Sequence, residues 1–221
     1  MKKNKIPESF AIFSIENFLS NEDLNKINLI LKEIKKKVKV QFGKYSVHNS
    51  DGISSKHSPF IFEPNGRYEL NNIPKEITEI LDIAVKSNLS SIKEIFPKAK
   101  HALPWNYVEY NSNQYCNSHV DYLFKTEKKE IVYCGIGIML KNAEKGGEFY
   151  IETSGSSDYI SNGKAKKNLN YSNDKFIKMP KTKWVVEQGL GTALLYGTQT
   201  IHGTNPVLNG KCKKIISWIA G

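Results

Sequence analysis

Two histidines and one aspartate are the residues of this sequence whose types and spacing favour metal chemistry. His119 and Asp121 are two positions apart, in or directly after a predicted strand. Residues two apart on a strand project from the same face, roughly 6.6 Å apart along the chain. His202 lies far downstream, directly before a predicted final strand. Two imidazoles and a carboxylate that leave one side of an ion open form the facial triad that suits iron(II). The His-x-Asp pair alone is a weak signal. A structural role for both histidines is the alternative.

Short strands after residue 100 are the elements expected to position these side chains. Runs of β-branched and aromatic residues, punctuated by Gly and Asn, predict strands at 105–110, 115–120, 131–140, 148–152, 184–186, 192–196, 200–202 and 213–219. Short strands without helices between them indicate an antiparallel sandwich or barrel. The run 131–140 is apolar on both alternating faces, as expected of a central strand covered on both sides.

Two helices are predicted before these strands. The first begins after Ser20, a cap residue, with Leu19 placed to contact Leu24 in a hydrophobic staple. The second runs from 74 to about 95. We therefore expect one domain over 1–221, with a helical support region at 1–100 and a β core at 101–221 that a polar insertion interrupts at about 153–183.

Composition and charge narrow the class of protein. The 221 residues carry a formal net charge of +10, but Arg67 is the single arginine among 32 basic residues. Lysines scattered over the whole chain favour solvated faces over a nucleic-acid footprint. The sequence has no long apolar run and no signal-peptide pattern, so we expect a cytoplasmic protein without a membrane span. Its three cysteines lack CxxC spacing, so we expect reduced thiols.

Taken in order, the motifs over about 107–218 resemble those of the iron(II)- and 2-oxoglutarate-dependent oxygenases, in particular the prolyl 4-hydroxylase-like branch. The matching residues are Tyr110, His119-x-Asp121, Met139-Leu140 followed by Gly146-Gly147-Glu148-Phe149, Gly191-Thr192-Ala193-Leu194-Leu195-Tyr196, and His202-Gly203-x-Asn205-Pro206-Val207 with Gly210. Together these motifs are specific for the family and much less specific for its substrates.

The resemblance implies a mainly β fold with N-terminal helices, in which two or three α-helices support a double-stranded β-helix core of the jelly-roll, cupin-like kind. It implies Fe(II) bound by His119, Asp121 and His202, with 2-oxoglutarate as co-substrate and O2 as oxidant. Ascorbate is a possible reductant in such an enzyme. The resemblance implies no catalytic residue beyond the metal ligands. The implied activity is that of a dioxygenase that hydroxylates a prolyl or other residue in a peptide or protein. An oxidative demethylase of nucleic acid and a non-catalytic binding module of the same fold are the alternatives.

One position departs from the family pattern. Where such proteins carry the basic residue for the distal carboxylate of 2-oxoglutarate, ten positions after the second histidine, this chain has Cys212. If position 212 faces the barrel interior, so does Lys214, and a lysine inside a barrel costs several kcal/mol unless an anion meets it. Lys214 is therefore the predicted co-substrate ligand. Lys213 is the second candidate if a bulge shifts the register, and a solvated surface lysine is the alternative for both.

Tyr110 and Arg67 are weaker candidates. The Tyr110 hydroxyl is placed to donate to the same co-substrate, or else belongs to a core tyrosine satisfied elsewhere. Arg67, in the segment between the two predicted helices, is a candidate for binding a substrate carboxylate or backbone, but an ordinary surface salt bridge is the favoured interpretation. The three tryptophans, Trp105, Trp184 and Trp218, are expected to pack the sheets.

Overall fold

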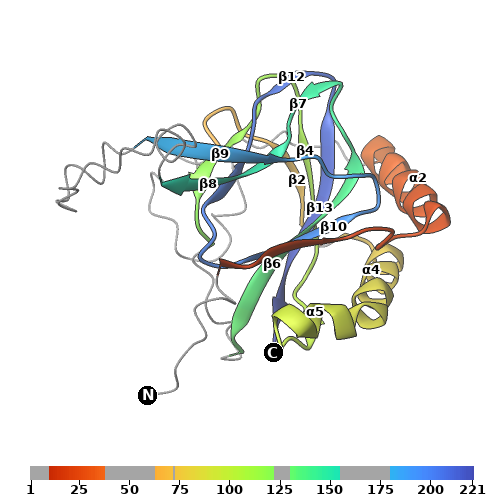
Figure 1. Ribbon diagram of the computed structural model, residues 1–221. Helices are drawn as coiled ribbons and strands as arrows, with labels where there is room; N and C mark the ends of the chain where they lie inside the picture. Colours follow the sequence, from red (N-terminus) through yellow and green to blue (C-terminus); the bar gives the residue numbers. More distant parts are fainter. Residues whose placement is uncertain (1–9, 38–62, 72, 122–129, 155–179) are drawn as a thin grey trace, which may run out of the picture.

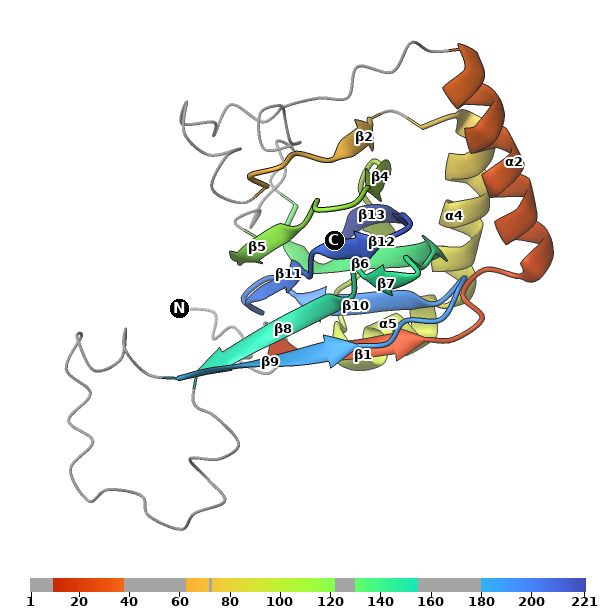
Figure 2. The same cartoon turned by 90° about the horizontal axis from the view of Figure 1, so that it is seen from above.

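Two antiparallel sheets face each other, and three helices lie against the outer side of the larger one (Figures 1 and 2). The computed structural model describes residues 10–37, 63–71, 73–121, 130–154 and 180–221. Most of the polar insertion predicted at 153–183 therefore lies outside the described residues.

Each predicted strand overlaps a strand of these two sheets, the one predicted at 200–202 only at His202. The larger has the order β1 (Ile12–Ile15), β10 (Ala193–Gly197), β6 (Val132–Lys141), β13 (Cys212–Ala220), β4 (Asn106–Tyr110) and β2 (Tyr68–Leu70), with β3 (His101–Ala102) paired to β13. The smaller has the order β5 (Cys116–His119), β11 (His202–Thr204), β8 (Phe149–Ser154) and β9 (Lys181–Val186). A separate two-stranded sheet is formed by β12 (Val207–Asn209) and β7 (Lys145–Gly146). The predicted mainly β, double-stranded β-helix architecture is confirmed.

The helices are α2 (Asn21–Lys37), α4 (Lys75–Ser87) and α5 (Leu89–Ile95). Ser20 caps α2 as predicted, because its Oγ accepts a hydrogen bond from the backbone N–H of Asp23 at 3.1 Å. The prediction of a single helix over 74–95 was wrong at Asn88. Both the backbone N–H and the side-chain amide of Asn88 donate to the carbonyl of Ala84, a local arrangement that competes with continued helix, so the chain divides here into α4 and α5. None of the described helices is long and apolar enough to cross a membrane.

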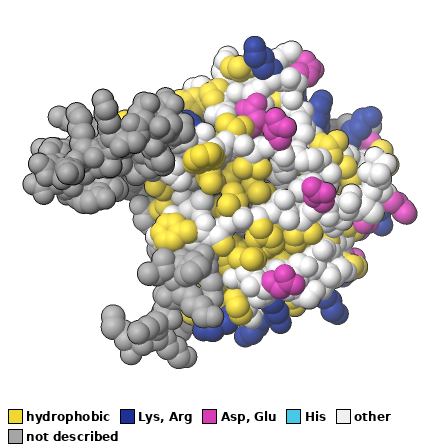
Figure 3. Space-filling model, in the orientation of Figure 1, with side chains coloured by type: hydrophobic (Ala, Val, Ile, Leu, Met, Phe, Trp, Pro, Cys, Tyr) yellow, Lys and Arg dark blue, Asp and Glu magenta, His cyan; other side chains and the backbone are white. Residues whose placement is uncertain are grey.

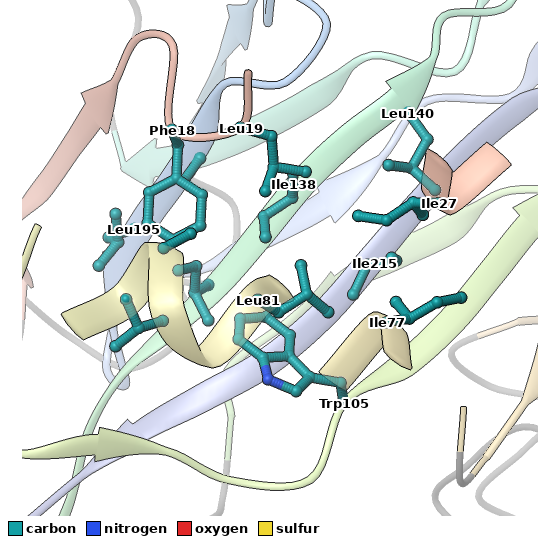
Figure 4. Packing of buried hydrophobic residues seen from close by; sticks show 14 of the residues in the cluster. Phe18, Leu19, Ile27, Ile77, Leu81, Trp105, Ile138, Leu140, Leu195 and Ile215 are labelled. Atoms are coloured by element: carbon teal, nitrogen blue, oxygen red, sulfur yellow. The ribbon is translucent and has the colours of Figure 1, made fainter. Parts of the chain in front are cut away.

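The hydrophobic core lies between these helices and the larger sheet. Figure 4 shows side chains of α2 and α4, among them Ile27, Ile77 and Leu81, against Ile138 and Ile215 of the sheet. Strand β6 lies between β10 and β13, as predicted for a central strand. Its even-numbered residues from 134 to 138 point into this core and are fully buried. Every second position of β6 is thereby turned toward the space between the two sheets.

Five short strands were missing from the sequence prediction: β1, β2, β3, β7 and β12. Each has only two to four residues, which is too short for an alternating pattern to stand out from a loop. Two of them change the support region, because β1 and β2 extend the larger sheet at its two edges. Residues 1–100 thus supply strands as well as helices.

Leu81→Ala tests the helix-to-sheet core. Leu81 is fully buried on α4, whereas Ile83, two residues later, is 65% exposed. We expect Leu81→Ala to lower the free energy of unfolding by about 2–5 kcal/mol, measured by urea denaturation, because it leaves a cavity. Ile83→Ala is the matched control and should change it by less than about 0.5 kcal/mol. Equal losses in the two variants would contradict this packing.

Candidate metal centre

Strands β5 and β11 bring the two predicted histidine ligands together. His119, the last residue of β5, pairs directly with His202, the first residue of β11, and their ring centroids are 4.4 Å apart. Asp121 follows two residues after His119, and its Oδ1 lies 3.9 Å from His202 Nε2. One potential ligand atom from each of the three side chains lies within 4.8 Å of the other two. The structure therefore places the three residues as one candidate metal site.

Each of the two imidazoles turns its Nδ1 toward a backbone carbonyl. His119 Nδ1 lies 2.8 Å from the carbonyl of Asn117, and His202 Nδ1 lies 2.9 Å from the carbonyl of Thr200. A carbonyl only accepts, so each Nδ1 carries a proton, and Nε2 is the nitrogen through which each neutral ring can bind a metal. Burial and the neighbouring His202 lower the pKa of His119 to about 4, which keeps this imidazole neutral at pH 7.

Asp121 is held by a tryptophan of the opposite sheet. The indole Nε1 of Trp218, on β13, donates to Asp121 Oδ2 at 3.0 Å, and Asp121 is 7% exposed. This bond orients the carboxylate so that Oδ1 is the oxygen nearer to His202. Outer partners of this kind fix the orientation of ligands before a metal binds.

Lys214 points into the same space. It is 5% exposed, its Nζ lies 3.4 Å from Thr204 Oγ1, and none of the described carboxylates forms an ion pair with it. Cys212, two residues earlier, is buried against Met139, whereas Lys213 is only partly buried. A register irregularity does fall between Lys213 and Lys214 in the pairing with β6, but the pairing with β4 is continuous there. It is Lys214 that lines the cavity, as strand alternation predicted.

Arg67 is buried, so the interpretation of it as a surface salt bridge was wrong. It is 7% exposed and forms ion pairs with Glu63 at 2.7 Å and Glu69 at 3.1 Å. Burial alone would lower its pKa, but Glu63, Tyr110 and Glu69 outweigh it and raise the pKa well above the usual value. Arg67 thus lies in the cavity wall with its charge balanced by two carboxylates.

The Tyr110 hydroxyl belongs to the same network. It accepts a hydrogen bond from Arg67 Nη1 at 2.9 Å and donates to Glu63 Oε1 at 3.5 Å. Burial raises the pKa of Tyr110 well above its usual value, so the hydroxyl stays protonated. Tyr110 lines the cavity, as a co-substrate ligand must, but its hydroxyl already has partners.

A single cavity between the sheets contains all of these groups. Its walls include the three candidate metal ligands, Lys214, Thr204, Tyr110, Arg67 and Trp218. Cys116 also lines the cavity, but burial raises the pKa of its thiol to about 12. The thiol is therefore protonated at neutral pH and is a poor metal ligand.

Comparison with known proteins gives matches at the level of structure. No family model and no curated protein matches the sequence. A viral collagen prolyl hydroxylase from Paramecium Bursaria Chlorella virus-1, in complex with 2-oxoglutarate, is 14% identical over 98% of this chain and 99% of that chain, with a TM-score of 0.56. A Pseudomonas putida prolyl-4-hydroxylase is 9% identical over 96% and 93%, with a TM-score of 0.60. HygX from Streptomyces hygroscopicus, with nickel and 2-oxoglutarate bound, is 11% identical over 97% and 84%, with a TM-score of 0.60.

The chain has the fold of the iron(II)- and 2-oxoglutarate-dependent oxygenases. The fold that the sequence resemblance implied is therefore confirmed, along nearly the whole chain rather than over 107–218 alone.

Sequence reasoning missed several residues of this oxygenase-fold cavity. Trp218 was expected only to pack the sheets, but it binds Asp121; strand alternation from Lys214 could have placed it inside. The rings of Phe149 and Tyr196 lie against His202, with centroids 5.4 Å and 4.3 Å from that of the imidazole. Both residues belong to the motifs that match the family, but no sequence signal placed their rings against His202.

The other two tryptophans differ from each other. Trp105 is buried and donates to Asp82, as expected of a packing residue. Trp184 is 52% exposed, so the expectation that it packs between the sheets was wrong.

Gly135 makes the Tyr196 contact sterically feasible. A Cβ built at Gly135 would lie 2.5 Å from the Tyr196 ring, well inside van der Waals contact. Only a residue without a side chain leaves room on β6 for the ring that covers His202.

Trp218→Phe tests the support of Asp121. The variant keeps an aromatic ring but removes the donor to Oδ2, so we expect metal affinity to fall by about 10-fold to 100-fold in an anaerobic Fe(II) titration. Trp184→Phe is the matched control, because it removes an indole donor to Thr153 at an exposed position. An unchanged affinity in Trp218→Phe would contradict the positioning role.

Proposed function

We propose that the chain is an Fe(II)- and 2-oxoglutarate-dependent dioxygenase that hydroxylates a prolyl or other residue in a peptide or protein. One observation carries the proposal. A single cavity contains a His-His-Asp cluster whose ligand atoms lie within 4.8 Å of one another and, on its walls, a buried lysine that no described carboxylate balances.

The cluster fits a divalent iron ion. Two imidazoles from one strand pair and the carboxylate that follows β5 are the donor set of the 2-His-1-carboxylate triad. His119 and His202 would bind through Nε2, because their Nδ1 atoms donate to backbone carbonyls. Asp121 would bind through the oxygen that Trp218 leaves free. When bound, iron(II) supplies the redox chemistry that couples O2 to the oxidation of 2-oxoglutarate and substrate.

Lys214 and Thr204 fit the distal carboxylate of 2-oxoglutarate. A buried ammonium without an anionic partner is costly, and a carboxylate meeting it would offset that cost. The Thr204 hydroxyl, 3.4 Å from Nζ, adds a second donor on the same side. Arg67 is less suited, because Glu63 and Glu69 already balance its charge. Tyr110, held by Arg67, would form the wall of this subsite rather than its main donor.

The surrounding rings would restrict water at the metal ligands. Phe149 lies nearly parallel to the His202 ring, at 18°, and Tyr196 covers it at 47°. Excluding water strengthens the electrostatic interactions inside the cavity and limits side reactions.

A peptide or protein is the substrate class we propose. Two of the structures that the chain resembles are described as prolyl hydroxylases, and neither the charge nor the arginine content favours nucleic acid. The single guanidinium, that of Arg67, is buried among carboxylates and is not presented to a phosphate.

Lys214→Met tests the co-substrate assignment. This variant keeps the length of the side chain but removes its charge, so we expect the visible charge-transfer band of the anaerobic Fe(II) and 2-oxoglutarate complex to be lost at co-substrate levels that saturate the natural protein. Lys213→Met is the matched control and should keep the band. The reverse outcome would move the carboxylate to Lys213.

Succinate release tests the activity. The chain, supplied with Fe(II), 2-oxoglutarate and O2, would be assayed against proline-containing peptides, free amino acids and methylated oligonucleotides. We expect release to rise with a peptide of the panel and to be abolished by Asp121→Ala. Stimulation by oligonucleotides alone would favour a demethylase, and a chain that binds no Fe(II) would be a non-catalytic module.

A further inference from the structure

A second groove lies between the edges of the two sheets. It runs between β1 and β9, and its lining includes Ile12, Ile151, Trp184, Val186, Leu190 and Leu194. The face that Figure 1 presents includes β1 and β9, and on this face Figure 3 shows hydrophobic side chains gathered across the middle with acidic side chains beside them. None of the candidate metal ligands lines this groove.

Both strands beside the groove are edge strands. Within the described sheets, β1 pairs only with β10, and β9 pairs only with β8. The outer edge of each strand therefore presents backbone N–H and C=O groups to which no described strand is paired. Such edges are templates for pairing with another extended chain.

Large apolar side chains line the groove and are partly or largely exposed. Trp184 and Leu190 are 52% and 55% exposed, and Ile12, Ile151 and Val186 are only partly buried. Exposed apolar side chains gathered in a groove with a polar rim are typical of protein interaction sites.

The charge of the groove is opposite to that of the chain. Glu16 and Glu187 belong to its lining and are exposed, and no lysine or arginine is among the lining residues that the structure describes. The chain as a whole carries +10. A partner drawn to this groove by charge must be basic, because acidic partners would be drawn to the lysines elsewhere.

We infer that this groove docks an extended segment of a partner protein in which apolar residues alternate with lysine or arginine. The segment pairs with the outer edge of β9 beside the groove, at Trp184 and Val186, its apolar side chains cover the groove floor, and its basic side chains meet Glu16 and Glu187. This is recognition by strand addition, in which backbone pairing gives affinity and side-chain pockets give specificity. Gln188 and Leu194 line both this groove and the cavity of the candidate metal centre, so a docked segment lies beside the cavity wall. Docking itself needs no metal and is independent of the proposed activity.

Calorimetry with the metal-free full chain tests this inference. The probe is a capped eight-residue peptide of alternating lysine and valine, and the comparison peptide alternates glutamate and valine. We expect the lysine peptide to bind and to change the fluorescence of Trp184, and the glutamate peptide not to bind. A lysine peptide that does not bind would overturn the inference.

Two double variants separate local contacts from net charge. Glu16→Lys with Glu187→Lys should weaken binding by about tenfold or more, because both rim charges are reversed. Glu79→Lys with Glu94→Lys makes the same change in net charge at exposed helix positions away from the groove and should have little effect. Equal weakening by the two double variants would overturn the local assignment.

Backbone pairing and self-association have their own controls. Two variants of the lysine peptide carry backbone N-methyl groups, one at the odd-numbered and one at the even-numbered residues. One of the two should lose affinity, because its methyl groups block the N–H donors that pair with β9. Undiminished binding of both methylated peptides would contradict strand addition. The chain could also form a dimer through this groove. If the chain dimerises and the double variant Glu16→Lys with Glu187→Lys abolishes the dimer, the groove binds a second copy, which would overturn the proposed partner.

Discussion

The pairing register of β5 and β11 is the constraint on which the rest of the site depends. It sets His119 opposite His202, so that two imidazoles meet without any loop having to position them. A slip of one residue would turn one histidine to the other face of the sheet. On its other side β11 pairs with β8 in a fixed register, with His202 opposite Ile151. The smaller sheet thus holds the histidines, and the larger sheet supplies the residues that complete the site, Trp218 and Lys214 from β13.

The distribution of buried charge explains why the cavity suits an anion next to a cation. Arg67 and Lys214, the two buried basic side chains that line the cavity, differ in their carboxylate partners. Arg67 has Glu63 and Glu69 beside it, whereas Lys214 has a threonine hydroxyl as its described hydrogen-bond partner. The uncompensated positive charge is therefore at Lys214. The position of Lys214 is therefore better evidence for the ligand of the cavity than the net charge of the chain is.

The chemistry-bearing residues could be predicted from the sequence because their signals are local. Period-two alternation places Lys214 with Cys212 on one face of β13, and the two-residue spacing keeps Asp121 close to His119 although β5 ends at His119. The failures share another cause. Arg67 was expected at the surface, but it is buried and bonded to Tyr110, 43 residues away, and no local pattern shows that contact. Asn88 divides a helix through a side-chain hydrogen bond that helical periodicity does not register, and β1 and β2 are too short to show alternation. Local periodicity predicts which face a side chain occupies, and long-range packing decides what it meets.

A crystal structure of the chain, grown under argon with Fe(II) and 2-oxoglutarate, tests the proposed metal and co-substrate sites most directly. We expect one iron ion bound by His119 Nε2, His202 Nε2 and an Asp121 oxygen, with the distal carboxylate of 2-oxoglutarate on Lys214. An ion bound elsewhere, or a carboxylate that meets Lys213 or Arg67 instead, would contradict these sites.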